Sequence, residues 1–256
     1  RLVNTFFIDM NVLNKDQIIK SDWFTEFHIG NDAPGVRHFR DDGEVRIWEH
    51  NQNKARDLGW TADNVTYHFN DMGYRGGISP GHGVPAGFGC SCTFGTGVDE
   101  RHHWPGIMGI ANCGQPGSSN DKIARLAVSY INTYKPREIF ICWTYPQRRE
   151  WVDEFGNVIG FKNVTAAEAA GMMAQKFVSW DNAHLYLQNE LWDEYNYTKN
   201  VLFVESYCTA NDVKLYYTSM LEQDHTRYPY SRDLNHPGPL WHINVAALFQ
   251  DLSYGN

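Results

Sequence analysis

The apolar run at residues 138–143, Glu-Ile-Phe-Ile-Cys-Trp, is the feature that most constrains the fold of this chain. It has the length of a β-strand, and its apolar residues do not alternate with polar ones, so both of its faces should be covered. Such strands belong to parallel sheets that carry helices on each side. The preceding residues 119–134 have apolar positions at helical spacing, with Ser119 or Asn120 available as N-cap, and Pro136 ends the segment.

Shorter apolar segments before and after this run complete an alternation of strands and helices. Strands are predicted at residues 65–69, 84–90, 110–113 and 201–207, and helices at residues 242–252 and at 165–198 with a break near 180–182. Strands that alternate with helices indicate an α/β fold. The expected architecture is a three-layer α/β/α sandwich around a central, mostly parallel sheet.

The length of the chain favours one large domain with an appended segment. The 256 residues can bury a sizeable core, and 42% of them are hydrophobic. No internal repeat is visible, and turn-forming residues are spread along the chain rather than gathered into a linker. Residues 1–60 alternate weakly through Val45, Ile47 and Trp48 between charged loops, which is typical of hairpins, loops or a short helix. We expect an N-terminal extension at 1–60 and the α/β domain at 61–256.

The charge of the chain narrows the classes of partner. A formal net charge of −8 argues against a broad surface for nucleic acid or for an anionic membrane. No apolar run of about 18 residues occurs, so no membrane span is expected and a soluble protein is predicted. No secretory signal is visible and the chain begins at Arg1 rather than Met, so the sequence leaves its compartment open, together with its oligomeric state.

The cysteines and histidines do not form a metal-binding pattern. The five cysteines lie in or beside apolar runs and are expected to be reduced core thiols, with a disulfide between neighbouring strands as the alternative. Cys90 and Cys92 have no second pair at zinc spacing, and His102 and His103 belong to no helical metal motif. We expect these two histidines at the surface, and neither a metal nor another cofactor.

Three loops at predicted strand ends carry residues suited to acyl transfer, at the edge where parallel sheets bind ligands. Residues 89–95 place Ser91 on a tight turn from a strand to a helix, where backbone N–H groups can bind negative charge. Residues 112–121 contain glycines whose N–H groups can face a substrate oxygen. Residues 233–238 contain Asp233 and His236, three positions apart, as a base and the group that orients it. Each loop taken alone is also compatible with a plain turn.

Together, and in this order, the three loops resemble the blocks of the SGNH hydrolase family, also called GDSL lipases and esterases. The resemblance spans roughly residues 65–252, and residues 70–75 look like a turn that precedes the first block in one branch of the family. The matching positions are Gly89, Ser91, Thr93 and Gly95 in the first block, Gly117 in the second, and Asp233, His236 and Pro237 in the closing block.

The resemblance implies a flavodoxin-like sandwich and a catalytic triad. Ser91 is then the nucleophile, His236 its base and Asp233 the partner of the histidine, while the N–H groups of Ser91 and Gly117 form an oxyanion hole. The sequence departs from the family at Cys90, where an aspartate is usual. It departs again in the third block, where the oxyanion-binding asparagine is missing after residue 143.

The loop after residue 143 must therefore supply a substitute donor if the chain is active. Candidates are Thr144, Gln147 and Arg148, because this loop should reach the same end of the sheet. Trp143, Tyr145 and Arg148 are candidate substrate-binding residues, which could stack on a sugar, line an acyl pocket or clamp an anion. The alternative for Arg148 and its neighbour Arg149 is a pair of surface ion pairs with Glu150 or Asp153.

The function expected from this reading is hydrolysis of a carboxylic ester through an acyl-enzyme. The substrate would be a small molecule, carbohydrate or lipid that carries an O-acetyl or other acyl ester. The alternative is a binding or structural protein that keeps the fold and has lost full activity, a reading that the missing asparagine supports. The retention of Ser91, Asp233 and His236 together argues against it, because a binding module needs none of the three.

Overall fold

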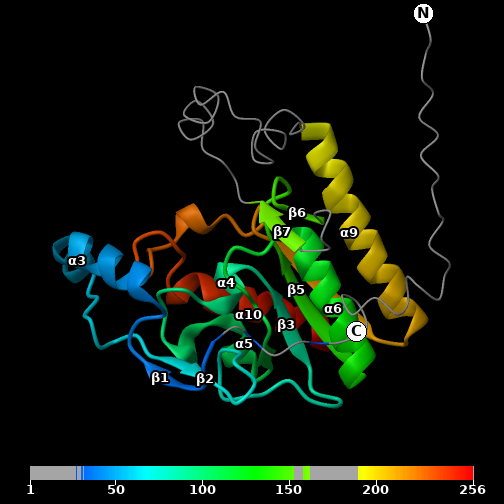
Figure 1. Ribbon diagram of the computed structural model, residues 1–256, viewed down its shortest axis with the longest axis horizontal. Coiled ribbons are helices and arrows are strands. Elements are labelled where there is room, and N and C mark those ends of the chain that lie inside the picture. The colour runs from blue at the N-terminus through cyan, green and yellow to red at the C-terminus, as the bar shows by residue number, and fades with distance from the viewer. Residues whose placement is uncertain (1–26, 28–29, 31, 153–157, 162–189, 256) are drawn as a thin grey trace, which may run out of the picture.

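The computed structural model describes residues 27, 30, 32–152, 158–161 and 190–255 (Figure 1). Its main sheet has four parallel strands, β3 (Ala86–Gly89), β4 (Ala111–Asn112), β5 (Glu138–Trp143) and β8 (Lys214–Ser219). They lie in the order β4-β3-β5-β8, so the first strand of the sheet in the chain has the second on one side and the third on the other. This is the flavodoxin-like order of doubly wound folds, and it confirms the predicted α/β class.

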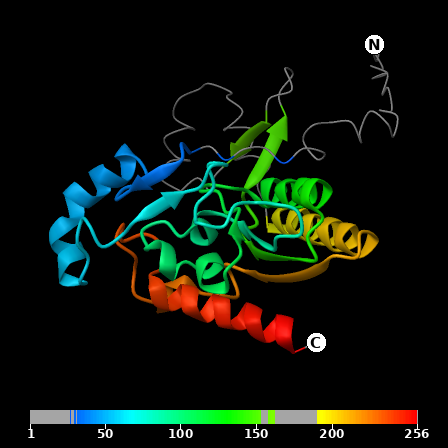
Figure 2. The same cartoon turned by 90° about the horizontal axis from the view of Figure 1, so that it is seen from below.

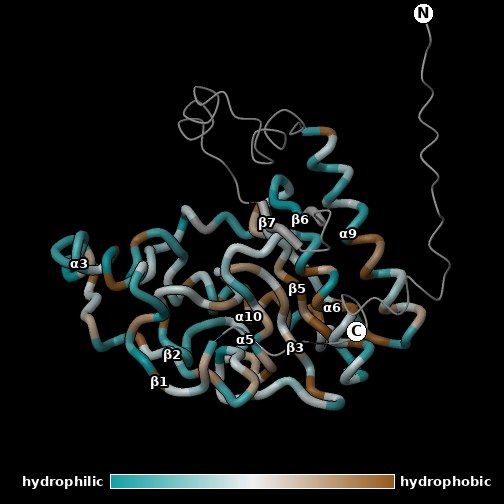
Figure 3. Tube along the Cα trace, viewed as in Figure 1, coloured by the Kyte–Doolittle hydropathy of each residue, from teal (hydrophilic) through white to brown (hydrophobic). Residues whose placement is uncertain are grey.

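Helices cover both faces of this sheet (Figure 2). Helices α6 (Asn120–Tyr134) and α9 (Glu190–Ala210) pack on one face, where Ile139 and Ile141 of β5 join their core. Helices α5 (Trp104–Met108) and α10 (Pro239–Tyr254) pack on the other face, against Phe140 and Cys142. Side chains of β5 thus alternate between two apolar layers, as the continuous apolar run predicts. Figure 3 shows hydrophobic residues concentrated along these inner elements.

The prediction for residues 201–207 was wrong, because this segment belongs to helix α9. Its buried residues Val201, Val204 and Cys208 recur at helical spacing, whereas Leu202 and Phe203 are exposed. The fourth strand is β8, further along the chain. Residues 165–189 of the predicted helix at 165–198 lie outside the described residues, and residues 190–198 are helical.

The N-terminal part of the described chain contains a helix over the weakly alternating residues 45–48, which is one of the forms left open for this segment. Helix α3 (Asp42–Asp57) begins where the Asp41 side chain accepts a hydrogen bond from the N–H of Glu44 at 2.9 Å. Strand β1 (Gly35–Arg37) before it pairs with β2 (Tyr67–Phe69) in antiparallel fashion. Residues 1–26 lie outside the described residues, and the division of the chain at residue 60 stays a prediction.

The remaining elements are short. They are helix α4 (Ser91–Phe94), the 3₁₀ turns η1 (Glu100–His102) and η2 (His225–Arg227), and a hairpin of β6 (Arg149–Val152) and β7 (Val158–Phe161). The five cysteines are buried free thiols. Within the described ranges, no helix combines the length and the apolar character needed to cross a membrane.

Candidate active site

Ser91 lies directly after β3, at the first position of α4, and is only 8% exposed. The turn that presents it depends on Gly89. A Cβ atom at this position would lie 2.0 Å from Oγ1 of Thr93 and 2.8 Å from the carbonyl oxygen of Cys142. Only a residue without a side chain lets α4 fold back this closely on the sheet, so Gly89 and Thr93 shape the turn around Ser91.

Ser91 and His236 line the same cavity, which has a volume of about 170 Å³. It lies at the carboxyl ends of β3, β5 and β8, next to the point where the strand order reverses, and this is where such sheets place ligands. The Ser91 hydroxyl has the Cys90 sulfur at 4.0 Å, and no hydrogen bond joins it to His236 among the described contacts. The other residues that line the cavity are Cys90, Cys92, Tyr145, Arg148, Met220, Asn235 and Pro237.

Asp233 and His236 contact each other within one tight loop. Oδ2 of Asp233 is 2.5 Å from Nδ1 of His236, and Oδ1 accepts hydrogen bonds from the His236 N–H at 3.0 Å and from the Ser231 hydroxyl at 2.7 Å. A carboxylate can only accept, so Nδ1 carries the proton and Nε2 is left as the basic nitrogen. The structure therefore gives His236 the tautomer that a general base for Ser91 requires.

The surroundings of Asp233 keep its charge. Burial by itself would raise the pKa of this carboxyl group, but the hydrogen bond and charge of His236, together with the Ser231 hydroxyl, lower the pKa to about 2. Asp233 is consequently ionised at neutral pH and can stabilise a positive charge on the imidazole.

Of the three candidates for the missing donor, Arg148 lines the cavity. Its Nη1 donates to Oγ1 of Thr144 at 3.1 Å, and its Nε is buried without a partner among the described residues. Neither Thr144 nor Gln147 lines the cavity. Thr144 is fully buried and lies behind Arg148, whose guanidinium it contacts. The alternative of surface ion pairs does not hold for the described carboxylates, because Arg149 pairs with Asp193 and Glu150 with Arg125, while Asp153 lies outside the described residues.

The other predicted residues fall in different places. Tyr145 lines the cavity, and the Arg148 guanidinium lies 5.5 Å from its ring centre. Trp143 is fully buried in the core, where its ring meets Tyr197 edge-on, so it does not face the cavity as expected of a substrate-binding residue. Gly117 has a left-handed backbone with φ of 79° in the loop after β4, and it does not line the cavity.

Sequence reasoning missed two buried side chains that support the site. Arg75 is 1% exposed and donates to the carbonyl groups of Phe94, Gly95 and Val98, which satisfies the end of α4. Asn120 of α6 exchanges two hydrogen bonds with the backbone of Thr144, at 2.9 and 3.2 Å. The turn at residues 70–75 marked the first of these, but no local pattern marked the second.

The expectation of two surface histidines was half wrong. His103 is 1% exposed, and its Nδ1 accepts from the N–H of Gly106 at the start of α5. Burial lowers the pKa of His103 well below its usual value and lowers the pKa of His242 to about 3, so both rings are neutral. The described residues contain no group of three or more metal-ligating side chains.

A second cavity of about 360 Å³ adjoins the first, since Tyr145 and Met220 line both. We call it the outer cavity. It follows the loop after β8, and its remaining lining residues are Leu221, Glu222, Gln223, Asp224, Thr226, Arg227 and Tyr228.

No family model matches the chain, and no curated protein matches it. Among solved structures, it is similar to a Clostridium thermocellum family 3 carbohydrate esterase, with a TM-score of 0.32 and 14% sequence identity over 67% of this chain and 96% of that chain. A likeness of this size carries no argument about activity. The function must therefore be argued from the geometry of the site.

Proposed function

We propose that the protein is a serine esterase in which Ser91 is the nucleophile, His236 the general base and Asp233 the partner of the histidine. The observation that carries this proposal is the shared cavity: Ser91 and His236 line it together, and Asp233 holds the imidazole from behind at 2.5 Å. A buried serine on a strand-to-helix turn, a histidine and an ionised aspartate are the groups that acyl transfer needs.

The reaction proceeds in two halves. Ser91 Oγ attacks the ester carbonyl carbon while Nε2 of His236 takes the hydroxyl proton. The bond to the alcohol oxygen then breaks, and the alcohol leaves with that proton. Water attacks the acyl-enzyme as Nε2 takes a proton from it, and Ser91 recovers its hydrogen when the carboxylic acid is released. Asp233 stabilises the imidazolium in both halves.

The developing oxyanion requires donors, and we assign this role to the N–H group of Ser91 and to the Arg148 guanidinium. Gly117, the donor that the sequence resemblance also implies, does not line the cavity and is not assigned. Arg148 is favoured over Thr144 and Gln147 because it is the one of the three that lines the cavity. The Arg148 guanidinium is oriented by its hydrogen bond to the Thr144 hydroxyl, and the buried Asn120 side chain holds the backbone of Thr144. An arginine would replace the neutral asparagine of the family by a charged donor.

The two cavities favour an ester of a small acyl group with a larger polar alcohol. The cavity at Ser91, at about 170 Å³, is smaller than the roughly 300–1,000 Å³ of pockets that enclose drug-sized ligands, so a short acyl group such as acetyl fits it best. The outer cavity offers Tyr145 and Tyr228 beside charged side chains. It suits a carbohydrate better than a lipid chain.

Hydrolysis of acetyl, butyryl and long-chain aryl esters by the wild-type chain and by Ser91→Ala tests the proposal. We expect the acetyl ester to be the best substrate and the variant to be inactive, because its methyl group cannot form an acyl-enzyme. Equal hydrolysis by both proteins rules out Ser91. No hydrolysis by either would favour the alternative of a fold retained for binding, which the missing asparagine of the third block supports.

A further inference from the structure

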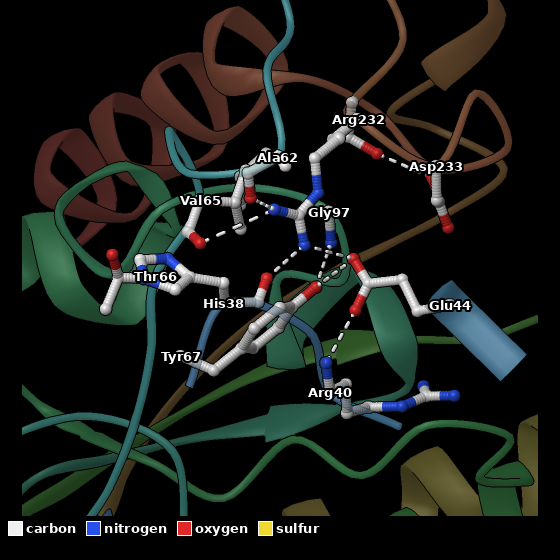
Figure 4. A network of polar contacts seen from close by, with 12 residues as sticks. His38, Arg40, Glu44, Ala62, Val65, Thr66, Tyr67, Gly97, Arg232 and Asp233 are labelled. Carbon is white, nitrogen blue, oxygen red and sulfur yellow. Dashed lines mark hydrogen bonds and ion pairs between the residues drawn. The ribbon is translucent and has the colours of Figure 1, made fainter. Parts of the chain in front are cut away.

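Arg232, the residue directly before Asp233, is one of the most deeply buried charges in the described chain. Its side chain is 1% exposed and reaches toward the N-terminal part of the molecule. There it donates to Oε1 of Glu44 in helix α3 at 2.9 Å, and the Glu44 side chain is itself only 4% exposed (Figure 4). A buried charge is strongly destabilising unless a partner compensates it. The contact with Arg232 therefore fixes the position of α3.

The rest of the Arg232 guanidinium binds the chain on both sides of α3. It donates to the carbonyl group of Ala62 at 2.7 Å and to that of His38, and it stacks 4.1 Å from the ring centre of Phe39. Segments 170 and 194 positions away in the chain thus converge on the residue next to Asp233. The contact ties the N-terminal segment to the loop that holds His236.

A second path leads from Glu44 back to the same loop. The Tyr67 hydroxyl donates to Oε1 of Glu44 at 2.8 Å and accepts from the N–H of Gly97 at 2.7 Å. The carbonyl group of Gly97 then accepts from the N–H of Arg232 at 3.0 Å. Glu44, Tyr67, Gly97 and Arg232 therefore form a closed ring of hydrogen bonds. Figure 4 shows the links that involve the Glu44, Tyr67 and Arg232 side chains.

This ring contacts the side chains that fix Asp233. Gly97, with φ of +78°, lies so close to Ser231 that a Cβ atom there would be 2.4 Å from the serine Oγ, and that Oγ donates to Asp233. The turn between Asp233 and His236 also holds Leu234 in a left-handed backbone conformation with φ of 57°. Such strain in a non-glycine residue lasts only where the surroundings impose it.

We propose that Glu44, Tyr67 and Arg232 are positioning residues, which hold the Asp233–His236 loop against the cavity through the buried ring. The proposal rests on the proposed esterase function for its kinetic consequence, but its structural content is independent of turnover. A buried ion pair is often no more stabilising than an apolar pair of similar size, so its retention here is better explained by the geometry it imposes.

Two variants test the ring, Tyr67→Phe and the double variant Glu44→Gln with Arg232→Gln. Tyr67→Phe removes one hydroxyl group and keeps the aromatic side chain, so this variant should fold even if the double variant is less stable. The double variant removes one charge of each sign, so the net charge beside His236 is unchanged. Asp233 of its own loop and Arg148 of the loop after β5 also stay in place, and a shift of the pH profile therefore reports geometry rather than charge.

We expect kcat for the acetyl ester to fall about ten- to a hundredfold in the double variant with KM little changed, because the base is misplaced while the cavity remains. A weaker contact between Asp233 and His236 should also move the acidic limb of the kcat/KM profile to lower pH. Arg125→Met is the matched control. It breaks a partly buried ion pair with Glu150, at 2.9 Å, that does not reach Asp233. It should alter stability without moving the acidic limb.

The proton on Nδ1 of His236 gives a readout that does not depend on turnover. Its downfield NMR resonance should be present in the wild-type chain and in Arg125→Met, and broadened or shifted upfield in both ring variants. Loss of this resonance in the ring variants of a protein that hydrolyses no ester would overturn the esterase function and keep the positioning role. Unchanged kcat, acidic limb and resonance in both ring variants would overturn the positioning role itself.

Discussion

Arg148 lines the cavity together with Ser91 and His236 and is the proposed oxyanion donor of the loop after β5. Comparison of Thr144→Ala, Gln147→Ala and Arg148→Ala separates its role from those of its neighbours. We expect Arg148→Ala to lose about 100- to 1000-fold in kcat, the effect of removing one oxyanion donor. Thr144→Ala should lose less because it acts through Arg148, and Gln147→Ala should stay close to the wild type. Full activity in all three variants would reject a substitute donor in this loop.

Asp233 should make the folded state sensitive to acid. Its pKa is about 2 in the folded chain against an ordinary 3.8, so its contribution to stability is complete above the unfolded value and is lost as the pH falls through the folded one. The shift corresponds to about 2 kcal/mol. Urea unfolding of the wild type and of Asp233→Asn at about pH 6 and about pH 3 measures it.

We expect the difference in unfolding free energy between these two proteins to shrink at the lower pH. At about pH 3 the Asp233 carboxyl group is largely protonated in the unfolded wild-type chain but still mostly ionised in the folded one, so proton uptake favours unfolding. Ser231→Ala serves as the control. It removes one hydrogen bond to Asp233 and should show the same trend with a smaller amplitude. A difference that is constant over this range would contradict the account of Asp233 as a buried, paired carboxylate.

At the scale of the element, the start of α6 both caps the helix and holds the loop after β5. Ser119 caps the helix, accepting from the N–H of Lys122 at 3.1 Å, whereas Asn120 reaches across to hold the backbone of Thr144. Ser119→Ala should cost about 1 kcal/mol and leave kcat unchanged. Asn120→Ala should cost about 2–4 kcal/mol and also reduce kcat, because it leaves two buried backbone groups unpaired and frees the loop that carries Arg148. Equal effects on kcat would show that the hydrogen bonds between Asn120 and Thr144 do not position Arg148.

The elements differ in how well the sequence predicted them. The strand at residues 138–143 and the helix at 119–134 agree with the structure because burial on both faces and helical spacing are local signals. The segment 201–207 misled because it is rich in apolar residues, although its buried positions already followed a helical period. Strand β8 escaped notice because its apolar run, Leu215–Tyr217, is only three residues long and lies between Lys214 and the polar Thr218 and Ser219.

At the scale of the whole molecule, chain order sufficed to place the site at the carboxyl edge of the sheet. The four-strand order puts the loops after β3 and β5 side by side, as a doubly wound fold requires. The link between Glu44 and Arg232 could not be predicted in this way, since it joins residues 188 positions apart and neither stands in a motif. Such long-range ion pairs depend on how α3 packs against the loop before α10 in the folded molecule.

The central claim concerns the reactivity of Ser91, and covalent labelling with a fluorophosphonate followed by peptide mass spectrometry tests it most directly. We expect one phosphonyl adduct, on the peptide that contains Ser91, absent from Ser91→Ala and formed much more slowly by His236→Gln. A wild-type chain that stays unlabelled, or an adduct on any other residue, would contradict the assignment of Ser91 as a nucleophile activated by His236.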